Sequence, residues 1–156
     1  MHFLQQMYII RMIEPMSVNG RKTISQMKKV YFYDLGLRNM VYNSFNEVNF
    51  RTDKGAIFEN EVMLELWRNR SAGEVLRFYR TLNGSEVDFV IDGPIRKMLV
   101  ECKFQNNAKV MKLPAMTNLA TDLDGAVTRC YVANLNYFSD EPPIRMMPCY
   151  WCDRIR

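Results

Sequence analysis

Histidine is almost absent from this chain of 156 residues, because His2 is the only one. Nucleophile systems of the Ser-His-Asp and Cys-His types need an imidazole base, so hydrolases of those classes are set aside. No apolar run approaches the roughly 20 residues of a membrane helix, and the apolar residues 7–10 are ended by Arg11. Residues 1–6 show neither a basic leader nor a small-residue cleavage site, so a signal peptide is not expected. These absences predict a cytoplasmic protein.

A phosphate-binding loop and a zinc centre are missing as well. Residues 20–23 (GRKT) faintly resemble the end of such a loop, but Pro15 stands where its first glycine belongs. The chain alone is therefore not expected to hydrolyse ATP. Of four cysteines only Cys149 and Cys152 are closely spaced, and in the strand expected there they face opposite sides. We expect free, buried thiols in a reducing compartment.

Positive charge is unevenly distributed. The chain has 21 basic and 17 acidic side chains, and the whole excess of +4 falls within residues 1–40. One interpretation is a surface for nucleic acid, with Arg21, Lys22, Lys28 and Lys29 as contact candidates. The alternative is an ordinary solvated face, because the excess is modest and contains no long basic run.

Length and composition are those of one globular domain, with 48% hydrophobic and 24% charged residues. Residues 1–50 predict irregular structure with short helical pieces, and we expect them to form an N-terminal extension packed on a core of residues 51–156. Within that core, turn signals and hydrophobic patterns separate six further elements. They are a helix at 56–69, strands at 75–81, 86–92 and 97–104, a helix at 114–122 and a strand at 126–133.

This order predicts an α/β fold with a mixed sheet. Two hairpins imply antiparallel pairing of the first three strands, and the strand–helix–strand unit implies a parallel pair with a right-handed crossover. Residues 144–151 predict one more strand.

Acidic residues stand where these patterns call for apolar ones. On the helix at 56–69, Glu59 shares the apolar face of Val62 and Leu66, where a carboxylate is costly unless it is paired or bound to a metal. On the strand at 86–92, Asp88 alternates to the face opposite Phe89. Both positions suggest chemistry rather than packing.

The turn between the second and third strands decides which acids meet. If residue 92 pairs with 95, then 88 pairs with 99, and Asp88 and Glu101 are diagonal neighbours roughly 7–8 Å apart. Both carboxylates then reach one divalent ion. An odd loop would separate them, and a solvated strand with Glu101 and Lys103 as surface charges is the alternative.

These residues resemble the PD-(D/E)xK nuclease superfamily, which has the restriction-endonuclease-like fold. The similarity consists of Asp88 followed after a hairpin by Glu101-Cys102-Lys103, with an inward Glu59 on the preceding helix. More narrowly, the chain is similar to the uncharacterised domain that follows a P-loop AAA+-type ATPase domain in bacterial and archaeal proteins. The matching blocks are residues 29–37, 55–60, 78–80 and 84–90.

The resemblance implies a phosphodiesterase that uses Mg²⁺ or Mn²⁺. Asp88, Glu101, the backbone carbonyl of Cys102 and Glu59 would hold the ion, and Lys103 would orient the attacking water or stabilise developing charge. It also implies an ATPase domain as partner, although the ATPase half is absent from this chain.

Two other functions stay open. The domain could keep the nuclease fold without catalysis and serve protein interaction, regulation of an ATPase or self-association. A purely structural DNA-binding domain is the third reading, and it needs the basic N-terminal quarter to form one patch.

Overall fold

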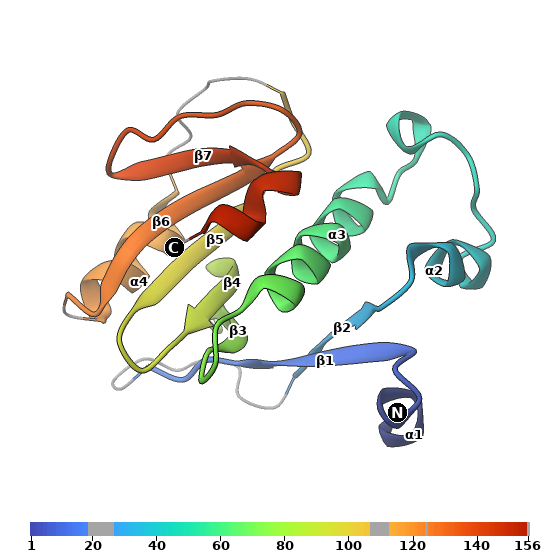
Figure 1. Ribbon diagram of the computed structural model, residues 1–156, viewed down its shortest axis with the longest axis horizontal. Coiled ribbons are helices and arrows are strands. Elements are labelled where there is room, and N and C mark those ends of the chain that lie inside the picture. Colours follow the sequence, from blue (N-terminus) through green and yellow to red (C-terminus); the bar gives the residue numbers. More distant parts are fainter. Residues whose placement is uncertain (19–26, 107–112, 124, 156) are drawn as a thin grey trace.

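A computed structural model describes residues 1–18, 27–106, 113–123 and 125–155 (Figure 1). The seven strands are β1 (Ile10–Pro15), β2 (Lys29–Phe32), β3 (Val75–Arg80), β4 (Glu86–Asp92), β5 (Lys97–Cys102), β6 (Val127–Asn134) and β7 (Ile144–Pro148). The helices are α1 (His2–Gln6), α2 (Leu35–Val41), η1 (Val48–Phe50), α3 (Lys54–Asn69), α4 (Pro114–Asp122) and η2 (Cys149–Arg154), where η denotes a 3₁₀ helix.

All seven strands form one mixed sheet in the order β2-β1-β3-β4-β5-β6-β7. Strands β3, β4 and β5 are antiparallel neighbours, whereas β5, β6 and β7 run parallel to one another. Helix α4 makes the crossover between β5 and β6, and Pro114 opens it at a position where the missing N–H costs nothing. The predicted α/β class, the order of elements and the parallel pair are confirmed.

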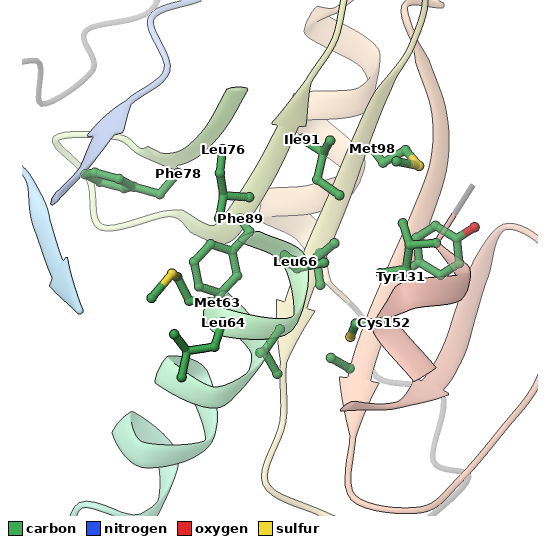
Figure 2. Packing of buried hydrophobic residues seen from close by; sticks show 14 of the residues in the cluster. Met63, Leu64, Leu66, Leu76, Phe78, Phe89, Ile91, Met98, Tyr131 and Cys152 are labelled. Carbon is green, nitrogen blue, oxygen red and sulfur yellow. The ribbon is translucent and has the colours of Figure 1, made fainter. Parts of the chain in front are cut away.

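Two helices cover opposite faces of the sheet. Side chains of α3 pack with Phe89 and Val100 in the larger apolar cluster, which also takes in Cys152 of η2. Side chains of α4 pack with Val90 and Leu99, the strand neighbours that point the other way. Figure 2 shows Met63, Leu66 and Phe89 in the layer between α3 and the sheet. Each such side chain stabilises the fold by about 1.5–3 kcal/mol when fully buried.

The N-terminal segment is more regular than expected. Strand β1 pairs with β2 and also runs parallel to β3, where Glu14 aligns with Arg77. The prediction of irregular structure with short helical pieces is therefore wrong for residues 10–15 and 29–32. Both strands are short. The partners of β1 are β2, which follows residues 19–26, and β3, which begins 60 residues after the end of β1. No local sequence pattern therefore indicates the pairing.

The C-terminal strand is shorter than predicted, because β7 ends at Pro148 and the chain continues as η2. Residues three apart lie above one another in a 3₁₀ helix, so the expectation that Cys149 and Cys152 face opposite sides is wrong. Both are free thiols, as are Cys102 and Cys130. Strand β5 likewise ends at Cys102 rather than at residue 104.

Within the described ranges, no helix is long and apolar enough to span a membrane.

Candidate functional site

A bulge in β4 determines the direction of Asp88. Arg77 of β3 aligns with Val90, but Tyr79 aligns with Val87, so β4 contains one residue more than its partner in this stretch. Val87 and Val90 therefore both pack toward α4, while Phe89 packs toward α3. Asp88 contacts groups on the α3 side, and the prediction that placed it on the face opposite Phe89 is wrong. Bulges next to functional sites commonly redirect a side chain in this way.

The turn between β4 and β5 also differs from the predicted register. Asp92 pairs with Lys97 and the Gly93 N–H donates to the Arg96 carbonyl at 3.0 Å, so residues 92 and 95 do not pair. Pro94 explains the shift, because its fixed φ suits the second position of a four-residue turn and not the third. The loop has an even number of residues, so of the two alternatives the odd loop does not occur. The register now brings Asp88 level with the Glu101–Lys103 stretch.

The Asp88 side chain is hydrogen-bonded to the backbone of the next strand, β5. Its Oδ2 accepts the Cys102 N–H at 2.9 Å. This bond joins the beginning of β4 to the end of β5 at the acid-x-lysine run. Glu101 follows the alternation of Leu99 on β5, and its Oε1 accepts a hydrogen bond from Lys103 Nζ at 2.6 Å. Glu101 and Lys103 thus form an ion pair on the face of Leu99, opposite to the α3 side that Asp88 contacts.

Three carboxylates converge on one ammonium group. Lys29 Nζ lies 2.8 Å from Glu59 Oε1, 2.6 Å from Glu86 Oε1 and 3.4 Å from Asp88 Oδ1. The side chains of Lys29 and Asp88 are each only 15% exposed. Helix α3 contributes Glu59, β4 contributes Glu86 and Asp88, and β2 contributes the lysine. We call these four residues the acidic cluster.

Strand β2 is held against α3 by two polar side chains. Tyr31 is buried, and its hydroxyl donates to Glu59 Oε1 at 2.6 Å. Asn60, only 2% exposed, accepts the Phe32 N–H at 2.9 Å and donates to the Phe32 carbonyl at 2.8 Å. The amide thereby satisfies the backbone of an edge strand, whose outer groups would otherwise lack partners. These contacts fix the position of Lys29.

Burial and neighbouring charges raise the pKa of some residues in the cluster and lower that of others. Burial, together with repulsion from Glu59 and Glu101, raises the pKa of Asp88 to about 6. Burial disfavours the charged form of Lys29, but attraction to Glu59 and Asp88 outweighs it and raises the pKa of the ammonium. For Glu86, hydrogen bonding to Lys29 outweighs burial and lowers the pKa.

The cluster holds an excess of negative charge. Arg80 also pairs with Glu86, so three carboxylates face two cationic side chains, Lys29 and Arg80. One net negative charge remains in a partly buried position. At Lys103, hydrogen bonding to Glu101 outweighs burial and raises the pKa, so that ammonium stays charged.

A cavity of about 330 Å³ opens beside the acidic cluster. It is the space next to Lys29 in which a small ligand or part of a larger one fits. Besides cluster residues, its walls include cationic and aromatic side chains. These are Tyr31, Phe32, Arg38, Tyr42 and Arg80.

The donor chemistry fits a hard divalent cation such as Mg²⁺, which prefers carboxylate oxygens. The Lys29 ammonium stands in for such an ion, because it shows that carboxylate oxygens from α3 and β4 surround one cationic centre. In this structure, however, no three histidine, cysteine or acidic side chains among the described residues are arranged to hold a metal ion.

The nucleic-acid contact candidates have separate surroundings. Arg21 and Lys22 lie outside the described residues. Lys28 is exposed on the surface and pairs with Glu14 at 2.6 Å, and Lys29 belongs to the acidic cluster. Two further cations of this quarter are also engaged within the chain. Arg38 binds Asp53 at 2.8 Å, and the Arg11 guanidinium lies 3.7 Å from the centre of the Trp67 ring.

Fold and site together define a mixed α/β domain with a carboxylate-rich cavity where α3, β2 and β4 meet. Residues 54–149, well over half of the chain, match the family described as a domain of unknown function, DUF4143. The chain belongs to this family. Comparisons with curated proteins and with solved structures gave no significant match. The matched segment includes α3 through β7, whereas Lys29 and Tyr31 precede it.

Sequence reasoning found Glu59, Asp88, Glu101 and Lys103 but missed three contributors. Glu86 stands two residues before Asp88 on the same strand, and that spacing was a usable signal. Lys29 was identified only as a candidate for contact with nucleic acid, and Asn60 was not identified at all. Both depend on where β2 lies, which local patterns do not reveal.

Proposed function

We propose that this chain is a metal-dependent nuclease or DNA-processing domain with a restriction-endonuclease-like core. It hydrolyses phosphodiester bonds with Mg²⁺ or Mn²⁺ and works beside an ATPase domain. One observation carries the proposal. The Asp88 carboxylate, re-aimed by the bulge toward Glu59, is hydrogen-bonded to the strand that bears Glu101 and Lys103. A carboxylate pair can hold a metal ion and a lysine can stabilise negative charge, and both actions favour phosphodiester hydrolysis.

Each side chain has a role in this proposal. Asp88, Glu101, the Cys102 carbonyl and Glu59 hold the ion, which when bound polarises a phosphoryl oxygen and lowers the pKa of a coordinated water. Lys103 stays protonated through its bond with Glu101 and so stabilises negative charge that develops on the phosphate. Arg80, on the wall of the cavity and about one third exposed, attracts the phosphate backbone.

The second candidate is a nuclease-fold module without catalysis that regulates an ATPase or mediates protein contacts. A specific observation favours it. Glu59, Glu86 and Asp88 already share the Lys29 ammonium, and Glu101 is already paired with Lys103. A site in which each carboxylate already contacts a cationic side chain of the same chain needs no metal ion for its stability.

Two substitutions separate these candidates. The purified chain is assayed on single-stranded, duplex and branched DNA and on RNA, with Mg²⁺, Mn²⁺ or EDTA. The nuclease proposal expects cleavage that needs a metal and that falls by at least about a hundredfold in Asp88→Asn and in Lys103→Ala. Asp140→Asn is the matched control, because Asp140 is 71% exposed and pairs only with Arg145 among the described contacts.

Control activity must equal that of the parent chain. Variants that cut as well as the parent would place the activity elsewhere or in a contaminant. A parent chain that cuts none of these substrates, alone and with an ATPase partner, would leave the regulatory module as the function.

A further inference from the structure

Lys29 occupies the point on which the carboxylates of the acidic cluster converge. We propose that its ammonium is a built-in cation and that a divalent metal ion binds this cluster only by displacing it. The inference rests on the proposed function, because Glu59 and Asp88 of this cluster are two of the metal ligands proposed there. It adds that the metal ion must compete with the Lys29 ammonium for the carboxylates.

A metal ion and the ammonium would share oxygens. Glu59 Oε1 and Asp88 Oδ1, oxygens of two proposed metal ligands, contact Lys29 Nζ at 2.8 and 3.4 Å. Mg²⁺ binds oxygen at roughly 2.0–2.1 Å, so an ion on these atoms would lie against the ammonium. Two cations at that separation in a partly buried site repel strongly. The ion and the ammonium therefore exclude each other.

Lysine is also able to leave. Lys29 is the first residue of β2, and its long side chain borders the cavity of about 330 Å³. Rotation of the side chain into that space moves the charge away from the carboxylates without moving the strand. The strand itself stays fixed, because Tyr31 bonds to Glu59 and Asn60 bonds to Phe32.

Charge balance favours this exchange over simultaneous binding. With Lys29 and Arg80 in place, the cluster carries about one net negative charge, too little for a divalent ion. Moving the ammonium outward raises the negative charge available to the ion. Removing it by mutation should do the same permanently.

The test measures metal binding and needs no nucleic acid. Mn²⁺ affinity is determined from the electron paramagnetic resonance signal of the free ion, for the parent chain and for Lys29→Met, which retains an apolar stem. We expect Lys29→Met to bind Mn²⁺ at least about tenfold more tightly. Its melting temperature should be below that of the parent in EDTA and should rise with Mn²⁺, whereas the parent should change little.

Lys97→Met is the matched control, because Lys97 is also a partly buried lysine that pairs with an aspartate, Asp92, at the far end of β5. Its Mn²⁺ affinity should equal that of the parent chain. Equal affinities of the parent and Lys29→Met would overturn the proposal, as would a folded Lys29→Met that binds no Mn²⁺.

A second variant covers the case in which Lys29→Met does not fold. Lys29→Gln removes the ammonium, leaves all three carboxylates to bind the ion and supplies an amide that can donate a hydrogen bond to Glu59. It should still bind Mn²⁺ more tightly than the parent, and equal or weaker binding would overturn the proposal. Because all readouts concern binding, a chain that exchanges Lys29 for metal but cuts nothing would refute the nuclease alone.

Discussion

Asn60 provides the sharpest test of how β2 is held in place. Asn60 is 2% exposed, and its amide makes paired hydrogen bonds to both backbone groups of Phe32, as a residue of a neighbouring strand would. Asn60→Ala removes both partners at once. It leaves the Phe32 N–H and C=O in a partly buried position that water reaches poorly.

The expected loss follows from these two groups. An unsatisfied buried backbone group costs about 1–3 kcal/mol. Phe32 is only half-buried, so the lower part of that range applies to each group. Alanine recovers about 0.6 kcal/mol through its better helix propensity. The net destabilisation should be about 2 kcal/mol, which lowers the melting temperature of a chain of this size by about 4–8 °C.

Urea denaturation measures this difference directly, with a shifted midpoint and an unchanged slope. Asn69→Ala on the same helix is the matched control, because Asn69 is exposed and bonds only to the Glu65 carbonyl among the described contacts. It should change stability by no more than about 0.5 kcal/mol. Hydrogen exchange at the Phe32 amide should accelerate in Asn60→Ala alone. If Asn60→Ala is no less stable than Asn69→Ala, the amide does not hold the strand.

Two further predictions concern charge. Because the folded-state pKa of Asp88 is raised to about 6, its ionisation destabilises the fold above that pH, and the penalty disappears as the pH falls toward the unfolded value near 4. Without metal, the Asp88→Asn variant should be more stable than the parent by about 2 kcal/mol at pH 8. It should lose this advantage near pH 4. A stability difference that does not change with pH would refute the raised pKa of Asp88. Arg51, 2% exposed in its side chain, binds Asp53 through two bonds of 2.9 Å and lowers its pKa, so this pair stabilises the fold above about pH 4 and less below it. Arg51→Lys should lower the melting temperature at pH 7, because lysine cannot make both bonds of the Arg51 guanidinium to Asp53. Arg68→Lys on the surface, where the side chain is 55% exposed, should change it little. Equal melting temperatures for the two variants would contradict this role of the Arg51–Asp53 pair.

Local signals were sufficient for the part of the fold that is built from neighbouring segments. The turn signals at residues 82–85 and 92–94, and Pro114 at the start of α4, delimit elements whose partners are adjacent in sequence. The inward direction of Glu59 followed from its spacing to Val62 and Leu66, and its contacts with Tyr31 and Lys29 supply the pairing that a carboxylate there requires.

The rest depended on details that periodicity does not encode. One extra residue in β4 turned Asp88 toward α3, and a strict alternation of two could not anticipate it. The turn centre moved by one residue, which the preference of Pro94 for the second turn position could have indicated. Lys29 meets Glu59 across 30 residues and Asp88 across 59, so their contact depends on the placement of β2.

The acidic cluster and strand β2 therefore depend on each other. Glu59, Glu86 and Asp88 all lie within the segment that matches the family, at residues 54–149, but the ammonium that balances them comes from β2 before that segment. Without Lys29 and the Tyr31 hydroxyl, three carboxylates would repel one another in a partly buried site. In return, those carboxylates hold the first and third residues of β2, a four-residue strand that pairs with β1 alone among the described strands. The contacts of Lys29 and Tyr31 with Glu59 therefore serve both to dock β2 and to balance charge in the cluster.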